Sequence, residues 1–467
     1  MKSVLNPETT DVQTEKPAAL SSSLPKKSGT RYLLFVLFVA TLLNGLDSSE
    51  FTSASTVIAR ELHLSISDIG FLASAFTIFL TISVIPVGLW ADRARRTRVI
   101  AVCLAVWSVA TGLTGLMGNF LGLFFTRMFT GVGEAGYMPA SNSLVGDFYP
   151  EGQRGRVMSW LALATLIGPI LGMVFGGVVA GLGYGAWRWA FFITMVPGVL
   201  LALAAWRMRE PARRQASSLK DQHPRSLHTQ NLSVTKPGEV FTQLRSVLRL
   251  KSLVYLIIFG VLTAFTATAL QAYFPTLLQQ QDALGLTSGQ AATFSGLALG
   301  PTAIIGVLVG GYLADRLNRR YRGANILVCV VSVVCTFPLN IATLVVMVTT
   351  HNLGLFLAFI IPAFLFNTLH VGALSAAVLD VTPATIRATA VAVSLFVQRI
   401  LGTALAPLVI GILAGYLDPA GTHFLHNQAG HDLVFALLCT CPLAFLVAAV
   451  MGIMALRSLR KQQAAVE

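Results

Sequence analysis

The chain has 467 residues, of which 55% are hydrophobic and only 11% are charged, and its mean hydropathy is +0.71. This composition excludes an ordinary soluble domain and predicts a polytopic membrane protein. The net charge of +13 does not indicate nucleic-acid binding, because Lys and Arg form short clusters between apolar runs rather than one basic face. All five Cys lie within apolar runs, so no disulfide framework is expected.

Residues 1–30 are rich in Ser, Pro, Thr and Lys and predict a disordered tail. The apolar run that begins at Tyr32 is too long for a cleavable signal peptide. Runs long enough to cross ~30 Å of hydrocarbon as helices follow. They cover about 32–57, 67–90, 98–117, 120–147, 156–182, 188–208, 252–279, 289–314, 323–349, 353–380, 387–416 and 432–456. The expected fold class is therefore an all-α membrane protein with twelve transmembrane helices, six in each half.

The expected domains follow from these spans. Residues 31–208 form an N-terminal six-helix bundle, 209–251 a cytoplasmic linker, 252–456 a C-terminal six-helix bundle and 457–467 a cytoplasmic tail. Apolar residues recur at helical spacing near the end of the linker: Val240, Phe241, Leu244, Val247 and Leu248. They predict either an amphipathic helix on the membrane surface or the lead-in to the seventh span.

The two halves repeat two motifs, which indicates a tandem duplication. The first has the pattern Gly, three residues, Asp, Arg, two residues, Arg. Its members are Gly88, Asp92, Arg93 and Arg96 in the first half and Gly311, Asp315, Arg316 and Arg319 in the second. The second motif, Asp147, Pro150 and Arg154, returns as Asp380, Pro383 and Arg387.

The basic residues predict the orientation in the membrane. If the twelve spans are correct, all but four of the 33 Lys and Arg lie on the same side of the membrane as the N-terminus. Arg60 and Arg188 lie on the opposite side, and Arg127 and Arg399 lie within spans. Positive residues favour the cytoplasmic side. We therefore expect a multi-pass protein of the inner or plasma membrane with both termini and both copies of the first motif in the cytoplasm.

Twelve spans, a six-plus-six repeat and this duplicated motif together resemble the major facilitator superfamily (MFS). The resemblance implies alternating access and a cytoplasmic latch between the halves, made by Asp92, Arg93, Arg96, Asp315, Arg316 and Arg319. The alternative is that these residues serve only as topology signals. The family's usual Gly two residues after the Asp-Arg pair is replaced here by Arg95 and Asn318.

The fourth span carries the sequence Arg127-Met-Phe-Thr-Gly131-Val-Gly133-Glu134-Ala135, which is similar to Spinster-like transporters. That resemblance implies an amphipathic, lipid-like or drug-like substrate. The same Gly-Glu-Ala stretch also resembles anion:cation symporters, which implies small organic or sugar acids instead. Spinster-like chains place Arg directly after the Asp of span 1, whereas Ser48 follows Asp47 here.

Charged residues inside spans are the main site candidates, because a charge facing lipid is costly. Asn44, Asp47 and Glu50 lie at positions i, i+3 and i+6 and form one polar stripe, while Arg127 and Glu134 are two turns apart on one face. The depth of each residue in its span predicts that Asp47 and Arg127 pair. We expect Asp47 or Glu134 to bind a coupling proton; the alternative is a static ion pair. Glu50 is expected in a solvated outer vestibule.

The second half offers fewer candidates. Arg399 is the best one for an anionic head group, His370 could titrate or simply pack, and Gln271 and Tyr273 are polar residues of span 7. The sequence has neither a nucleotide-binding phosphate loop nor a His-Glu-x-x-His motif. We therefore expect no enzyme, no cofactor and no bound metal, but a monomeric secondary transporter of a small molecule, coupled to protons.

Overall fold

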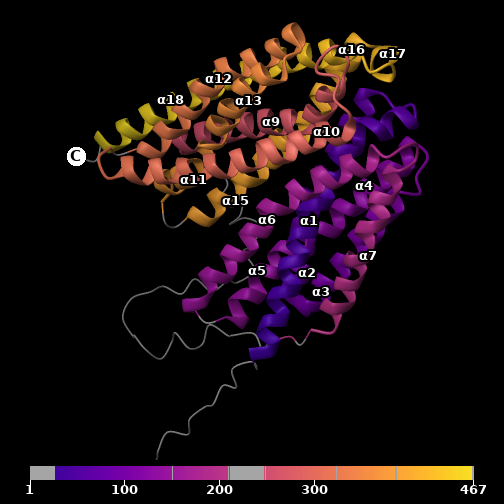
Figure 1. Ribbon diagram of the computed structural model, residues 1–467. Helices are drawn as coiled ribbons and strands as arrows, with labels where there is room; N and C mark the ends of the chain where they lie inside the picture. Colours follow the sequence, from indigo (N-terminus) through magenta and orange to yellow (C-terminus); the bar gives the residue numbers. More distant parts are fainter. Residues whose placement is uncertain are drawn as a thin grey trace, which may run out of the picture.

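The computed structural model describes residues 27–149, 151–208, 210, 247, 249–321, 323–383 and 386–464, and within these ranges every regular element is a helix. The helices form two bundles, one from each half of the sequence (Figure 1). Eleven helices, some of them interrupted, are long and apolar enough to cross a membrane. Large apolar side chains such as Ile85 and Leu308 are exposed on them, as expected for contact with lipid.

One further membrane crossing, which brings the total to twelve, is made by a broken helix in the N-terminal bundle. Its elements are α1 (Lys27–Glu61), α2 (Ile66–Arg93), α3 (Arg96–Thr114), α4 (Phe120–Glu134), α5 (Tyr137–Phe148), α6 (Glu151–Ala180) and α7 (Trp187–Trp206). Helices α4 and α5 together form the fourth span, and a turn at residues 135–136 separates them. The two helices cover the span predicted at about 120–147, and the break between them is a detail that the sequence did not indicate.

The C-terminal bundle contains several interrupted helices. Its elements are α9 (Lys251–Gln279), α10 (Ser288–Thr293), the π-helix η2 (Phe294–Ala298), α11 (Leu299–Asn318), α12 (Ala324–Thr350), α13 (Leu353–Thr368), α14 (His370–Val381), α15 (Arg387–Val397), the π-helix η4 (Gln398–Ala404), α16 (Leu405–Leu417), α17 (Thr422–Leu425) and α18 (Gly430–Ala464). The twelve-helix fold class is confirmed.

Both ends of the helical region differ from the prediction. Helix α1 starts within the expected tail, at Lys27, and α18 runs through the expected C-terminal tail to Ala464. Most of the linker lies outside the described residues, and so does nearly all of its expected amphipathic helix. Of that segment, the structure describes Val247 as helical and fully buried.

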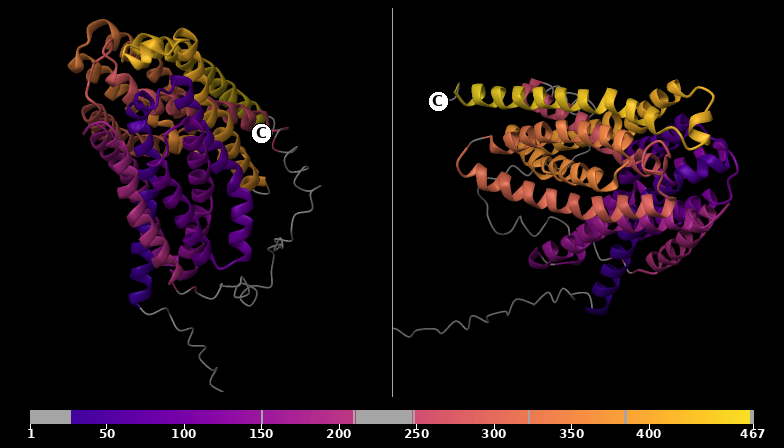
Figure 2. Two further views of the ribbon diagram at one scale, coloured as in Figure 1. Left: turned by 90° about the vertical axis from the view of Figure 1, so that its right-hand side faces the viewer. Right: turned by 45° about the horizontal axis from the view of Figure 1, so that its top comes forward.

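The two bundles meet at one end and diverge at the other (Figures 1 and 2). We call the end that carries the start of α1 and the end of α18 the terminal side, and the opposite end the closed side. Hydrogen bonds join the halves on the closed side: Thr56 Oγ1 to Thr276 Oγ1 (2.8 Å), Arg60 Nη2 to Gln279 Oε1 (3.1 Å), Ser67 Oγ to Gly411 O (3.0 Å) and Ser288 Oγ to Gly177 O (3.0 Å). The structure is thus a conformation that opens toward the terminal side.

Glycine allows a close approach between the halves. Gly70 in α2 lies against α16, and a Cβ atom added there would be 2.4 Å from the carbonyl oxygen of Pro407. The same carbonyl accepts a hydrogen bond from Tyr273 Oη at 2.6 Å. Helices α2, α9 and α16 therefore hold the closed side together, and a side chain at residue 70 has no room in this conformation.

Candidate functional site

Helix α4 presents two charged side chains to the interior of the N-terminal bundle. It begins after Asn119, whose Oδ1 accepts a hydrogen bond from Gly122 N at 2.8 Å. Gly131 lies against the backbone of α2 and Gly133 against that of α3, where added Cβ atoms would come within 2.4 and 2.6 Å of backbone atoms. The two glycines of the motif thus let α4 pack tightly, and Arg127 and Glu134 share the face between them.

Arg127 is only 2% exposed, although it is charged and lies midway through a membrane span. Its Cζ lies 4.6 Å from the ring centre of Phe51 and 5.9 Å from that of Phe76, so the guanidinium rests on aromatic faces. Its Nε and Nη2 atoms are buried without a hydrogen-bond partner. A buried guanidinium with free donors has the chemistry to donate hydrogen bonds to a carboxylate or phosphate group.

Asp47 lies near Arg127 but does not form the predicted pair in this conformation. The two residues interact electrostatically, yet no ion pair within 4.0 Å joins them. Asp47 Oδ1 instead accepts a hydrogen bond from Thr111 Oγ1 of α3 at 2.7 Å, while Oδ2 has no partner. No sequence signal marks Thr111, because threonines in helices commonly bond to their own backbone.

Glu134 completes the cluster on the terminal side of Arg127. Its carboxyl group lies close enough to the side chains of Asn44 and Asp47 to interact with them. Its Oε1 atom is buried without a hydrogen-bond partner. These neighbours of Glu134 come from α1 rather than from its own helix. The structure therefore brings Asn44, Asp47 and Glu134 together from two helices.

Glu50 does not lie in a solvated vestibule, and that expectation was wrong. Its side chain is 0% exposed, and neither carboxyl oxygen has a hydrogen-bond partner. The residue sits one helical turn beyond Asp47, nearer to the closed side, where α6 and α7 of its own bundle pack against α1. This packing between distant segments, which a sequence does not report, buries the side chain.

The candidates from the second half do not join this cluster. His370 is buried inside the C-terminal bundle, where its ring packs edge-to-face on Phe259 at 5.8 Å and its Nδ1 lies 3.5 Å from Ser332 Oγ. Tyr273 uses its hydroxyl for the Pro407 carbonyl. Arg399 in η4 and Gln271 in α9 are exposed and make no hydrogen bond or ion pair with any described residue. The packing interpretation of His370 fits its surroundings.

The duplicated motif lies on the terminal side, where the halves are apart. Most of its charged residues are exposed and form no ion pair with the part of the chain that the structure describes: Asp92, Arg93, Asp315, Arg316 and Arg319. Cβ atoms added to Gly88 or Gly311 would meet nothing within 4 Å. The expected latch is therefore not formed in this conformation.

Arg96 is the exception within the motif, because it is engaged inside its own half. It is 5% exposed, forms an ion pair with Asp147 and donates a hydrogen bond to Ser143, both in α5. Its Nε atom also lies 3.5 Å from Oε1 of Glu210, which follows α7. In the second half, Asp380 instead accepts a hydrogen bond from Asn325 near the start of α12. The repeated aspartates Asp147 and Asp380 thus each bind the start of the preceding span.

The two-bundle helical fold, with charged side chains buried inside the N-terminal bundle, is that of a membrane transporter. The comparison with known proteins agrees: residues 37–407 match the Major Facilitator Superfamily, and the chain belongs to it. It is a transporter of this superfamily and not an enzyme.

Several relatives lie in the Spinster branch of the superfamily. Protein spinster homolog 1 of Xenopus tropicalis is 26% identical over 398 residues, which cover 83% of this chain and 73% of that protein. The hexuronate transporter of Bacillus subtilis (strain 168) is also 26% identical, over 65% of this chain and 69% of its own length. The Spinster-like resemblance is confirmed, and sugar-acid transporters are similar as well.

A solved structure shows the same fold. The crystal structure of a bacterial homologue of the human lysosomal transporter Spinster, in an inward-facing and unoccupied conformation, superposes with a TM-score of 0.80 at 23% sequence identity. The match covers 93% of this chain and 98% of that protein. The D-xylose-proton symporter matches with a TM-score of 0.64 at 15% identity.

Proposed function

We propose that this protein is a proton-coupled transporter of an amphipathic small molecule, which works by alternating access. The observation that carries the proposal is the buried cluster around Arg127, which places three carboxyl groups near a single guanidinium. One fixed positive charge cannot balance three buried carboxylates, and an unbalanced buried charge is very costly. At least one carboxyl group of the cluster therefore binds and releases a proton during the cycle.

Asp47 and Glu134 are the proposed proton-binding residues. They lie within interaction range of each other, so the charge of one opposes the ionisation of the other. Glu134 sits toward the terminal side, where the halves are apart, and could release its proton there. Arg127 would then balance the remaining carboxylate or bind an anionic group of the substrate.

The distribution of polar groups supports an amphipathic substrate over a small acid. The buried charges lie in the N-terminal bundle, whereas Arg399 stands apart from Arg127 and His370 is used in packing. A polar head group would bind near Arg127 and an apolar tail would extend toward the C-terminal bundle. Small organic or sugar acids remain the alternative, which the similarity to the hexuronate transporter supports.

We also propose an orientation and a latch. The bias of Lys and Arg supports a cytoplasmic terminal side, so the structure represents an inward-open state of a monomer in the inner or plasma membrane. In the opposite state the exposed residues of the motif, Asp92 and Asp315 with their arginines, would meet helix ends of the other half and close the cytoplasmic side.

The test uses purified protein in liposomes with an imposed pH gradient, with fluorescent lysophosphatidylcholine and labelled galactonate as probes. We expect gradient-driven movement of the lysolipid, reduced at least tenfold in Asp47→Asn and Glu134→Gln. The matched control is Asp68→Asn, which removes a carboxylate at the helix cap of α2, away from the cluster. Movement of galactonate alone would establish the alternative substrate. Full gradient dependence in both variants would refute the assigned proton sites.

A further inference from the structure

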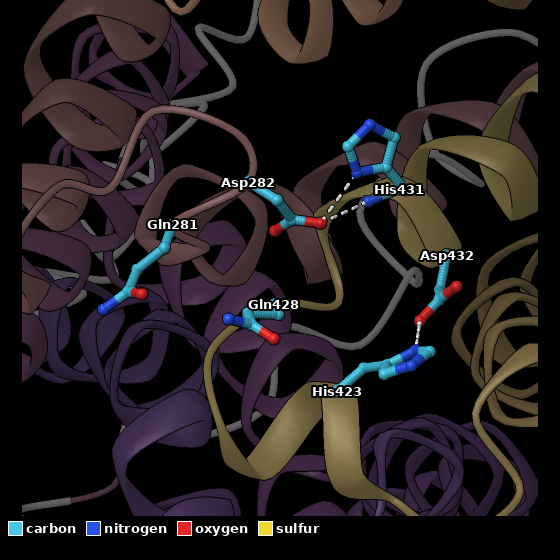
Figure 3. Close-up of a pocket in the computed structure, with 6 residues that line it drawn as sticks. All are labelled: Gln281, Asp282, His423, Gln428, His431 and Asp432. Atoms are coloured by element: carbon cyan, nitrogen blue, oxygen red, sulfur yellow. Dashed lines mark hydrogen bonds and ion pairs between the residues drawn. The ribbon is translucent and has the colours of Figure 1, made fainter.

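A polar pocket lies on the closed side of the C-terminal bundle, away from the cluster around Arg127. It measures about 500 Å³ and is lined by Gln281, Asp282, His423, Gln428, His431 and Asp432 (Figure 3). These residues come from the loop after α9, from α17 with the turn after it, and from the first turn of α18. Four of the six are His or Asp, which are the usual nitrogen and oxygen ligands of divalent metal ions.

Two of the lining side chains, His423 and Asp432, come together with the neighbouring Asp418, so that three possible ligand groups meet. The ligand atoms of Asp418, His423 and Asp432 all lie within 4.8 Å of one another, and His423 Nδ1 is 2.9 Å from Asp432 Oδ2. Asp418 is 8% exposed and the side chain of Asp432 is 15% exposed. Neither carboxylate forms an ion pair with Lys or Arg within the described ranges. Two carboxylates so close in a partly buried place repel each other, and a positive charge between them relieves that repulsion.

Neighbouring hydrogen bonds hold this group of residues in position. Asp418 accepts hydrogen bonds from the backbone N–H of Phe424 at 2.9 Å and from Thr422 Oγ1 at 3.3 Å, which orient its carboxylate. Asp282 accepts bonds from the backbone N–H groups of Gly430 and His431 and is 2.9 Å from His431 Nδ1 (Figure 3). The start of α18, which carries Asp432, is thereby fixed to the loop after α9. Such supporting bonds are typical around metal ligands.

We propose that Asp418, His423 and Asp432 bind a divalent transition-metal ion such as Zn²⁺, with water ligands completing its coordination from the pocket. One imidazole and two carboxylates without a thiolate suit Zn²⁺, Co²⁺ or Mn²⁺ better than Cu(I). Tetrahedral ligands at about 2.1 Å from Zn²⁺ lie about 3.4 Å apart. The three ligand atoms here lie within 4.8 Å of one another, so side-chain movements of roughly 1 Å would bring them to the ligand spacing of Zn²⁺. The ion would tie the end of α16 to the start of α18, directly beside the closed interface with α2.

Metal binding to the full-length protein tests this proposal without any transport substrate. The affinity tag is removed, the protein is treated with a chelator, and Zn²⁺ is titrated by calorimetry, with metal content after dialysis as a second readout. We expect one Zn²⁺ per chain and a rise in melting temperature on binding. His423→Ala and the isosteric Asp432→Asn should each weaken binding at least tenfold and abolish the rise.

His431→Ala is the matched control, because it removes a histidine from the same pocket outside the proposed ligand set. It should retain stoichiometric binding. The proposal is overturned if wild-type protein binds no more Zn²⁺ than His423→Ala. It is also overturned if His431→Ala loses the ion while His423→Ala keeps it. Because Asp432→Asn preserves the shape of the side chain, an unchanged gel-filtration profile of that variant separates lost ligation from misfolding.

Discussion

Replacing Gly70 with alanine should destabilise the closed side of the transporter. The added Cβ would lie 2.4 Å from the carbonyl oxygen of Pro407 and 2.7 Å from Tyr273 Oη. The nearest atom belongs to backbone, so the clash is relieved only if α2 and α16 move apart. Overpacking of this kind costs about 1–3 kcal/mol. At 1.4 kcal/mol per factor of ten, the ratio of open to closed molecules on this side should rise about 5- to 140-fold.

Spin-label distances between the halves measure that shift directly. Leu182, in the loop after α6, and Tyr416, in α16, are 76% and 80% exposed on the closed side and accept labels after mutation to cysteine. The exposed Cys439 is first replaced by serine. In Gly70→Ala the longer-distance population should grow at the expense of the shorter one, because the closed interface has been weakened.

Gly146→Ala is the matched control, since a Cβ at Gly146 in α5 meets nothing within 4 Å. It should leave the distance distribution unchanged. The comparison separates the steric clash at residue 70 from the general effect that a glycine-to-alanine change has on helix stability. An unchanged distribution in folded Gly70→Ala protein would refute the reasoning. It would mean that this contact does not decide between the two states.

Two further predictions concern charged residues outside the central cluster. Arg96→Ala should lower the free energy of unfolding by about 1–3 kcal/mol because it leaves the half-buried Asp147 without its partner, whereas the exposed Arg93→Ala should change it by less than about 0.5 kcal/mol; equal losses in thermal or denaturant unfolding would contradict this. Burial alone would raise the pKa of Asp282, but its hydrogen bonds from the start of α18 outweigh burial and hold the pKa below its ordinary value. The stabilisation is therefore present above the unfolded pKa of about 3.9 and is lost as the pH falls from that value through the lower pKa of the folded state, so the gap between the melting temperatures of wild type and Asp282→Asn should narrow as the pH is lowered below about 3.9; a gap that stays constant would argue against it.

Much of the architecture could be predicted from local sequence. A run of about 20 apolar residues is long enough to cross a membrane whatever lies elsewhere in the chain, and the repeated Gly-Asp-Arg motif reveals the duplication without any knowledge of contacts. The face shared by Arg127 and Glu134 follows from a spacing of seven residues on one helix. These features depend on the period of the helix and on hydropathy, both of which are properties of short segments.

The partners of these residues could not be predicted in the same way. Thr111 binds Asp47 because α3 packs beside α1, and Arg127 rests on Phe51 rather than pairing with Asp47. Glu50 is buried where α6 and α7 pack against α1. Each of these contacts joins segments distant in sequence, or depends on which of two conformations the halves adopt, and a helical period contains no information on either.

The sequence by itself thus determined the twelve-helix duplication and the small set of charges placed within the membrane. Only the tertiary structure decided which of those charges meet, which side of the molecule is closed, and that His423 lies beside Asp418 and Asp432 outside the membrane spans. The physical reason is that hydropathy and helix periodicity act along the chain. Packing between helices, and the arrangement of the two halves, arises from the summed contacts of the whole molecule.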